Sequence, residues 1–346
     1  MKLFFLAIGD RFRASSRLRV WDHVDWFAAQ GMVVRSDHVV PRHITQVDLQ
    51  LMARVFGRYF SWAKAFFESD TICIQETFAL CWLLPFRNLG KRRKVIFDFS
   101  DPVDYGSGRV QRLWRSMFRY VTRVADVVIC ENPDYISVLG RGNRPTYCYY
   151  GPVDARRYAS SRAAIEATPS GVSKDAVHVG WTGSPSTLAL IAPLFPVLDR
   201  LAATRSIRLT LLGVESQPYR FRNLQVDCIR WDEEIEFATV PRFDLGLFAL
   251  DRSEHSKWRG AGKLSIYMAA GVAFIATDRG IGQHVMRDAQ VGFRVADDSE
   301  WEPALMHAVD DAEARRLYSR KGMAFAQTGA SYDGFRGLLL KAFVST

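Results

Sequence analysis

The chain alternates between short apolar runs and amphipathic stretches along nearly its whole length. The run "KLFFLAIG" near the N-terminus is followed by "SSRLRVWDHVDWFAAQG", where Leu18, Trp21 and Val24 roughly follow one helical face. Gly31 ends that stretch. Because parallel strands are joined by crossover connections that are usually helices, this alternation predicts an α/β fold with parallel sheets wrapped by helices.

The same pattern predicts the remaining elements. Further strands are expected at 32–40, 70–75, 94–101, 125–132, 177–183, 207–214, 224–231, 243–250 and 272–277. Helices are expected at 49–67, 109–123, 184–203, 300–311, 312–328 and 332–343. Residues 151–176 contain no long apolar strand and carry Pro, Gly and Ser, which is typical of an interdomain connection.

With 346 residues the chain is long enough for two domains. We predict two tandem Rossmann-like, doubly wound domains facing a cleft, at residues 1–155 and 177–325. Residues 156–176 would link them, and 326–346 would form a final helix. In such sheets ligands bind beyond the carboxyl ends of the strands.

Composition limits the class of protein. A net charge of +9 predicts an anionic partner, such as a phosphate, a nucleic acid or an acidic membrane face. The 5 cysteines form no CxxC or Cys/His cluster, so we expect buried, reduced thiols in a cytosolic protein and no metal site. "MKLFFLAIGD" is predicted as a buried strand and not a signal peptide. No stretch reaches the roughly 20 apolar residues that span a bilayer, so any membrane contact is expected to be peripheral.

Two stretches in the second half suggest an anion site. In "GWTGSPSTL", Gly183 permits a sharp turn, Ser184 or Ser186 can cap the following helix, and Pro185 suits its first turn. Helix N–H groups there would hold an anion. Taken alone, this motif is more often an ordinary strand-to-helix turn.

In "RGAGKLSIYMAAG", Arg259 and Lys263 stand four residues apart, which places both cations on one side of the expected helix entry. Cations at the positive end of a helix are unfavourable unless an anion is present, so the pair indicates a ligand site. The alternative is a solvated basic turn. In "IRWDEEIEF", the strand is expected to end at Trp231, whose backbone would face a nucleobase. Asp232 or Glu233 would then reach sugar hydroxyls, or Asp232 would instead cap the next helix.

Polar residues also follow the strands of the first half. In "ASSRLR", Ser15, Ser16 and Arg17 are candidates for binding an acceptor or a phosphate, and one serine is also expected to cap the following helix. Glu131 and Asn132 follow a later strand on the same rim.

The stretch "FDFSDPVDY" places Asp98, Asp101 and Asp104 at a strand end. One of them is a candidate general base. Alternatively they cap a helix or pair with nearby arginines, and we expect a structural role for at least two.

Together these stretches resemble a GT-B-fold glycosyltransferase close to glycosyltransferase family four. The resemblance covers nearly the whole chain and is strongest from residue 178 to 295, where "VGWTGSPSTL", "LTLLG", "FDLGLFAL" and "RGAGKLSIYMAAGVAFIATDRG" occur in the family's order. It implies a nucleotide-diphosphate sugar co-substrate, transfer with retention, and neither a metal nor a resident cofactor. The acceptor would bind the N-terminal domain, to which the last helix would return.

The resemblance also implies roles for residues. Arg259 and Lys263 would neutralise the diphosphate and stabilise the leaving group. The other donor-binding candidates are Gly183, Ser184, Gly213, Trp231 and Asp232. The family usually carries two glutamates before its "YMA"-like segment, whereas here the corresponding positions fall near Trp258 and at Ile266.

Other functions stay open at this point. The missing glutamates favour a catalytically silent nucleotide-sugar-binding scaffold subunit, and the cation pair opposes it. A sugar-nucleotide epimerase is a minor alternative. A nucleic-acid-binding protein ranks last, because no recognised motif occurs.

The acceptor is expected to be a hydroxyl of a glycan, a lipid-linked sugar or a secondary metabolite. "GKRRKVIF" and "RVQRLWRSMFRYVTR" interleave cations with apolar residues, which suits an enzyme at the inner face of a membrane with anionic lipid. A solvated helix face over a buried aromatic stripe is the alternative.

Overall fold

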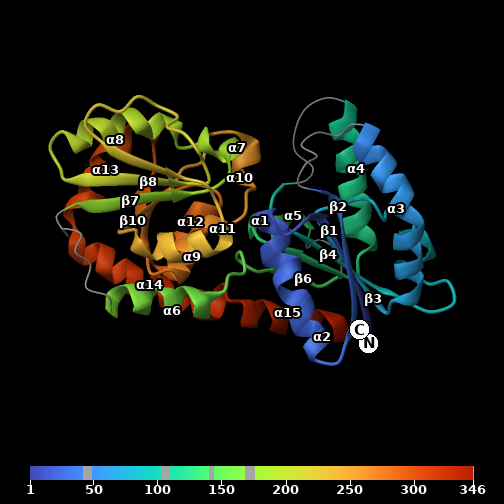
Figure 1. Cartoon of the computed structure of the whole chain (residues 1–346). Coiled ribbons are helices and arrows are strands. Elements are labelled where there is room, and N and C mark those ends of the chain that lie inside the picture. The colour runs from blue at the N-terminus through green and yellow to red at the C-terminus, as the bar shows by residue number, and fades with distance from the viewer. Residues whose placement is uncertain (42–48, 103–108, 140–143, 168–175, 346) are drawn as a thin grey trace. The chain divides into compact units, whose positions relative to one another are not determined.

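The computed structural model describes residues 1–41, 49–102, 109–139, 144–167 and 176–345. Within them the chain forms two six-stranded sheets, in the orders β2-β1-β3-β4-β5-β6 and β12-β11-β10-β7-β8-β9 (Figure 1). Every strand pair within them is parallel. The strands are β1 (Lys2–Gly9), β2 (Val33–Val40), β3 (Thr71–Gln75), β4 (Lys94–Phe99), β5 (Val127–Cys130), β6 (Thr146–Cys148), β7 (Val177–Thr182), β8 (Ile207–Leu212), β9 (Gln225–Ile229), β10 (Leu245–Phe248), β11 (Ala273–Thr277) and β12 (Phe293–Val295).

Helices connect most successive strands. They are α1 (Ala14–Ser16), α2 (Asp22–Ala29), α3 (Leu49–Glu68), α4 (Arg109–Val124), α5 (Asp134–Leu139), α6 (Ala155–Ala167), α7 (Pro185–Leu188), α8 (Phe195–Ala202), α9 (Glu233–Thr239), α10 (Glu254–Lys257), α11 (Gly262–Ala269), α12 (Ile281–Ala289), α13 (Trp301–Asp310), α14 (Ala312–Gly329) and α15 (Tyr332–Val344). A π-helical segment joins α1 to α2. The predicted α/β architecture with doubly wound parallel sheets is confirmed.

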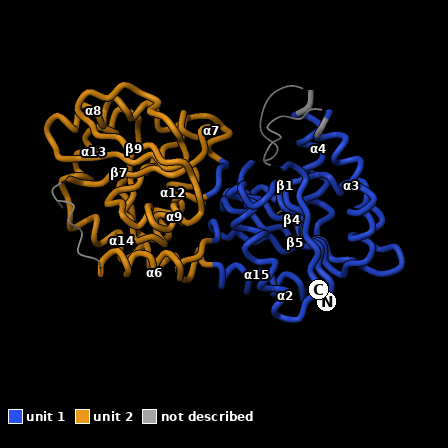
Figure 2. The backbone as a smooth tube through the Cα atoms, viewed as in Figure 1, with its two compact units in different colours: residues 1–152, 258–260, 332–346 blue, residues 153–257, 261–331 orange. Residues whose placement is uncertain are grey.

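The chain divides into two compact units (Figure 2). Unit 1 contains Met1–Pro152, Trp258–Gly260 and Tyr332–Thr346, and unit 2 contains Val153–Lys257 and Ala261–Ser331. The first half of the expected linker forms α6, which packs on α9, α11 and α14 within unit 2. The remainder of that linker, apart from residue 176, lies outside the described residues.

Alternate side chains of the first sheet enter two separate cores, as expected for a sheet covered on both faces. In β1, Phe4 and Leu6 join the core beneath α3 and α4, whereas Leu3 and Phe5 join the core that contains α2 and α15. The inner strands of unit 1, such as β1 and β3, are therefore nearly continuous apolar runs, whereas the edge strand β2 is not.

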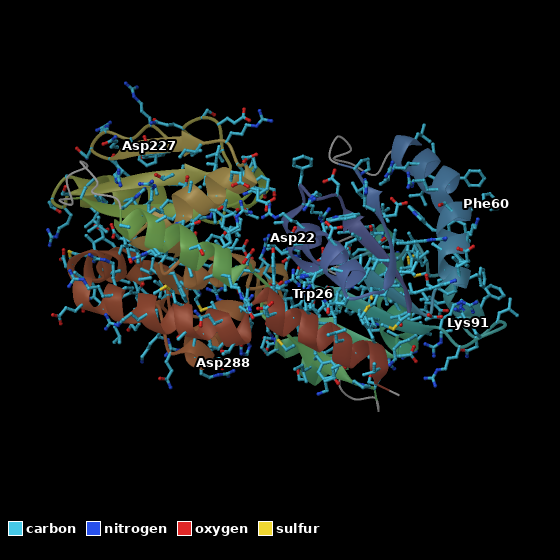
Figure 3. All side chains as sticks on the ribbon, turned by 60° about the horizontal axis from the view of Figure 1, so that its bottom comes forward. Asp22, Trp26, Phe60, Lys91, Asp227 and Asp288 are labelled. Carbon is cyan, nitrogen blue, oxygen red and sulfur yellow. The ribbon has the colours of Figure 1, made fainter. Side chains whose placement is uncertain are left out.

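Helix α15 is held on α2 by polar contacts as well as by apolar packing. The Tyr332 hydroxyl donates a hydrogen bond to Asp22, and the Arg336 guanidinium donates to the Asp22 carbonyl oxygen at 2.9 Å. The guanidinium also lies 5.2 Å from the Trp26 ring centroid. Asp22 and Trp26 are labelled in Figure 3. The C-terminal helix is thereby part of unit 1.

The second sheet repeats this arrangement. Val179 and Trp181 of β7 enter the core beneath α8 and α13. On the opposite face, Gly180 and Gly246 leave room for aromatic rings, because an added Cβ would lie 2.1 Å from the Phe243 ring and 2.8 Å from the Tyr267 ring. Gly246 thereby lets Tyr267 of α11 pack directly on the sheet, and Gly180 does the same for Phe243.

Two details differ from the predictions. Cys73, Cys81 and Cys130 are buried free thiols as expected, but Cys148 and Cys228 are only half-buried, because they lie on the short edge strands β6 and β9. Strand β9 ends at Ile229 and not at Trp231. Among the described residues, no helix is long and apolar enough to cross a bilayer.

The two faces of α3 give a direct test of its orientation. Phe66 is fully buried, whereas Phe60 on the same helix is 77% exposed. We expect Phe66→Ala to lower the free energy of unfolding by about 3–5 kcal/mol, because it leaves a cavity in the core. Phe60→Ala should change it by less than about 0.5 kcal/mol. Urea unfolding followed by circular dichroism checks this, and equal losses would show that α3 is turned differently.

Candidate functional site

Two glycine turns meet at the carboxyl ends of β7 and β8 in unit 2. Gly213 has φ +109°, and a Cβ there would lie 1.8 Å from the Gly183 carbonyl oxygen. A Cβ on Gly183 would lie 2.5 Å from the Trp181 ring and 2.7 Å from Lys263 Cε. Only glycine fits at these two turns, and it lets backbone and a lysine side chain approach one another closely.

Lys263 lies against these turns. Its ammonium donates a hydrogen bond to Thr187 Oγ1 at 3.3 Å and lies 5.5 Å from the Trp181 ring centroid. It sits in the first turn of α11, whose N-cap residue Ala261 makes no side-chain cap hydrogen bond. A cation and an uncapped helix N-terminus, both attractive to an anion, therefore lie at the end of the second sheet.

Arg259 is placed differently from the prediction. Helix α11 begins at Gly262, so Arg259 precedes the helix, and a helical spacing of four does not relate it to Lys263. The spacing argument for placing both cations on one side of the helix entry therefore does not apply, and their joint role stays a prediction. Arg259 belongs to unit 1, where its carbonyl oxygen accepts a hydrogen bond from Asn132 Nδ2 at 3.2 Å. Its buried Nε has no hydrogen-bond partner among the described residues.

The turn after β7 follows the prediction in part. Pro185 lies in the first turn of α7 and Ser184 is its N-cap residue, but the Ser184 hydroxyl does not cap the helix. It lies 2.9 Å from the Ser186 hydroxyl. Helix α12, which follows β11, also starts without a side-chain cap, at Gly280.

The segment after β9 is occupied by internal contacts. Trp231 Nε1 donates a hydrogen bond to Glu236 Oε2 at 2.5 Å. Asp232 caps α9 by accepting a hydrogen bond from the Glu234 N–H at 3.0 Å. Of the two alternatives for Asp232, the structure shows the cap.

In unit 1, a buried arginine lies at the carboxyl end of the first sheet. Arg19 Nε donates hydrogen bonds to both carboxylate oxygens of Asp98, at 2.8 and 3.0 Å. Its Nη1 lies 3.9 Å from Glu131. Burial lowers the pKa of Arg19, but Asp98, Glu131 and Glu76 together raise it. Arg19 therefore stays charged and compensates a group of acids.

Glu131 stands out within this group. It is buried, and its Oε1 has no hydrogen-bond partner among the described residues. Burial raises the pKa of the carboxyl to about 8, against the lowering effect of Arg19, while Asp101, Glu76 and Asp98 raise it further. Glu131 is thus a carboxyl group that holds its proton at neutral pH with one oxygen unused.

Glu76, which follows β3, is hydrogen-bonded to residues that follow β4 and β1. Its Oε1 accepts hydrogen bonds from the Ser100 N–H at 2.8 Å and from the Ser100 hydroxyl, and its Oε2 accepts one from the Ser15 hydroxyl at 2.9 Å. Its own backbone has φ +53°. A non-glycine residue in this conformation is strained, which is typical of functional positions.

Ser16 and Asn132 make hydrogen bonds that fix the loops at the strand ends. Ser16 Oγ donates to Gln75 Oε1 at 2.9 Å and accepts from the Gly9 N–H at 3.0 Å. The expectation that one serine caps the following helix is wrong, because Ser15 lies inside α1 and Ser16, the N-cap residue of the π-helical segment, makes no side-chain cap hydrogen bond. Arg17 is buried beside them, and Asn132 Oδ1 accepts from the Asp134 N–H at 3.0 Å.

The aspartates after β4 separate into two environments. Asp98 is buried on Arg19, and burial raises its pKa although Arg19 opposes this. Asp101 is exposed and accepts a hydrogen bond from the Gly260 N–H at 3.3 Å. Asp104 lies outside the described residues. Asp98 has the structural role that we expected of at least two of these acids.

Sequence reasoning missed Arg19, Glu76 and Gln75. A signal existed for Glu76, which directly follows the apolar run "TICIQ". Arg19 had no comparable signal, because it lies within "RLRVW", where an arginine is expected to be solvated. Among the residues with a described placement, no group of three or more His, Cys, Asp or Glu could hold a metal ion.

Comparison with known proteins identifies the fold. No protein-family profile and no curated sequence matches the chain. Solved structures do match over its full length. Sucrose-phosphate synthase from Thermosynechococcus elongatus aligns with a TM-score of 0.73 at 15% identity, covering 99% of this chain and 98% of that one. The chain has the GT-B fold of glycosyltransferases.

Two further GT-B structures are similar. Anabaena Alr3699/HepE, solved in complex with UDP, aligns with a TM-score of 0.68 at 14% identity, covering 100% of both chains. WaaG, a glycosyltransferase involved in lipopolysaccharide biosynthesis, aligns with a TM-score of 0.68 at 13% identity, covering 99% of this chain and 100% of that one. The resemblance predicted from the sequence is confirmed at the level of fold.

Glu131 makes stability depend on pH in a defined window. The pKa of its carboxyl is about 8 in the folded chain, against an ordinary value of 4.5. Between these pH values the folded state binds a proton that the unfolded state does not bind. The free energy of unfolding therefore falls as pH rises from about 4.5 to about 8. We expect Glu131→Gln to remove this loss. The unfolding free energy of the variant relative to the parent should rise across the window, by at most about 1.4 kcal/mol per pH unit.

Urea unfolding at a series of pH values measures this difference. Glu313→Gln, at an exposed position on α14, is the matched control and should show no such trend. Parallel pH profiles for the parent and Glu131→Gln would contradict the protonated state of Glu131.

Proposed function

We propose that the protein is a glycosyltransferase that transfers a sugar from a nucleotide-diphosphate sugar to an acceptor hydroxyl. The observation that carries this proposal is Lys263, held over Trp181 beside the Gly183–Gly213 turns at the carboxyl ends of β7 and β8. The GT-B fold and the UDP bound by Anabaena HepE support a nucleotide ligand there.

The donor is assigned to unit 2. Lys263 and the N-terminus of α11 would neutralise the diphosphate, and their positive charge would stabilise the leaving group as the glycosidic bond breaks. Arg259, whose Nε has no hydrogen-bond partner among the described residues, is proposed as the second phosphate-binding cation. Ser184 and the Trp231–Asp232 segment at neighbouring strand ends are proposed to flank the nucleotide. These protein cations take the part that a metal plays in other transferases.

The acceptor is assigned to unit 1. The carboxyl ends of β1, β3, β4 and β5 carry Ser15, Glu76, Asp101 and Glu131, a set of oxygens suited to binding hydroxyl groups. Asp98 is saturated by Arg19 and is proposed to position this set, whereas the exposed Asp101 is the better placed proton acceptor. Ser16, Arg17 and Asn132 would hold the strand ends around the acceptor.

The acceptor class is proposed to be a glycan or lipid-linked sugar, with retention at the anomeric carbon. WaaG acts in lipopolysaccharide biosynthesis, which supports an acceptor of this kind. A catalytically silent nucleotide-sugar-binding subunit is the second candidate. It is favoured by the absence of the family's two glutamates, whose positions fall near Trp258 and at Ile266, both of which are buried.

Nucleotide binding tests the proposed donor site. We expect at least one of UDP, GDP or ADP to raise the thermal unfolding midpoint, because a ligand at about 100 times its Kd stabilises a protein by about 2.7 kcal/mol. Lys263→Met should abolish this shift, since it removes the charge and keeps the methylene stem on Trp181. Arg259→Ala should weaken it strongly.

Lys321→Met on the exposed face of α14 is the matched control and should bind like the parent. If no nucleotide shifts the midpoint, the proposed donor site is wrong. Nucleotide binding without hydrolysis or transfer of the matching nucleotide sugars would instead favour the silent subunit.

A further inference from the structure

Helix α3 exposes a row of large apolar side chains. The row is Leu49, Met52, Phe56 and Phe60, spaced at three or four residues and therefore aligned along one face of the helix. Phe56 is 75% exposed and Phe60 is 77% exposed. Figure 3 shows Phe60 projecting outward from the helix. A helix that also buries Phe66 in the core needs no second apolar face for folding, so this row indicates an interaction surface.

Helix α4 exposes a row of arginines. Arg112, Arg115, Arg119 and Arg123 are exposed and follow the same helical spacing, and Arg109–Val124 contains no acidic residue. Like charges at this spacing destabilise a helix. The row therefore indicates an extended anionic partner.

The two rows belong to one surface of unit 1. Helices α3 and α4 both contribute side chains to the same core, Phe66 from α3 and Phe118 from α4 among them. Cys81 also lies in this core, and Tyr59 on α3 and Tyr120 on α4 both pack against the core, which marks the junction between the two helices. Tyr59 follows Phe56 by three residues, so the apolar row runs along the side of α3 that faces this junction.

The loop between β3 and β4 adds exposed apolar groups to the junction. Trp82 is 74% exposed, and Phe86 and Leu89 are also exposed. The buried guanidinium of Arg93 fixes this loop by donating hydrogen bonds to the carbonyl oxygens of Leu89 at 2.7 Å and Phe67 at 2.7 Å. The loop is thereby anchored to the end of α3.

We propose that this surface, formed by the α3 row, the Trp82–Leu89 loop and the α4 arginines, docks on a bilayer that contains anionic lipid. The apolar side chains would enter the boundary between headgroups and acyl chains, and the arginines would bind lipid phosphates. This proposal rests on surface residues alone and does not depend on the proposed transferase activity.

Charge and side-chain type favour a membrane over other partners. Leu49, Met52 and Leu89 are aliphatic and cannot stack on nucleobases as the aromatic side chains of single-strand-binding proteins do. In a symmetric dimer through this surface, the arginine rows would add like charge to the interface. A bilayer with anionic headgroups accommodates both the apolar and the cationic row.

Vesicle co-sedimentation of the full chain tests the proposal. The parent should bind phosphatidylcholine vesicles that contain phosphatidylglycerol and not vesicles of phosphatidylcholine alone. Arg112→Gln/Arg119→Gln/Arg123→Gln and, separately, Phe56→Ser/Phe60→Ser should each weaken binding by about tenfold or more. Arg316→Gln/Arg320→Gln/Lys321→Gln on the exposed face of α14 removes the same charge from unit 2 and should bind like the parent. Circular dichroism establishes that each variant is folded.

Several results would overturn the proposal. These are no binding of the parent to anionic vesicles, equal losses in the α4 and α14 variants, or undiminished binding of the Phe56/Phe60 variant. Tight binding of duplex or single-stranded DNA that is lost in the α4 variant, without vesicle binding, would identify a nucleic-acid surface instead. A dimer in light scattering that dissociates in the Phe56/Phe60 variant would identify a contact between two copies.

Discussion

The ion pair between the buried Arg19 guanidinium and Asp98 is the interaction on which the acidic residues at the carboxyl end of the first sheet depend. Asp98 and Glu131 come from neighbouring strands, and neither lies in water. Removing a buried charge partner typically costs about 3–5 kcal/mol, because the remaining charge has no compensation. Arg19 provides that compensation for Asp98, and the protonation of Glu131 limits the remaining negative charge. Several acidic side chains can therefore lie together at these strand ends without destabilising the fold.

In unit 2 the carboxyl end of the sheet carries positive charge instead of acidic residues. Lys263 lies at a helix N-terminus, where positive charges accumulate, and its described contacts are a threonine hydroxyl and the face of Trp181. One sheet of this fold therefore ends in acids arranged around one cation, and the other ends in a cation and helix dipoles, a division suited to binding hydroxyl groups and phosphates respectively.

Most of the fold could be predicted from sequence, because strands buried on both faces are continuous apolar runs such as "KLFFLAIG" and "TICIQ". Gly183 and Lys263 were also recognisable, since local turn chemistry places them. Arg19 was not, because its burial depends on acids that follow strands far away in sequence. The start of α11 at Gly262 was misjudged by a few residues, so the helical spacing used to relate Arg259 to Lys263 does not apply.

The way Arg93 holds its loop has a thermodynamic consequence. Its donors reach carbonyl oxygens of both the loop and α3, so the backbone around Phe86 and Leu89 has already lost its conformational freedom when the chain folds. A loop ordered in advance loses little further entropy when it meets a partner. The favourable free energy of contacts made by Phe86 and Leu89 would then be offset by little loss of conformational entropy when the loop binds a partner.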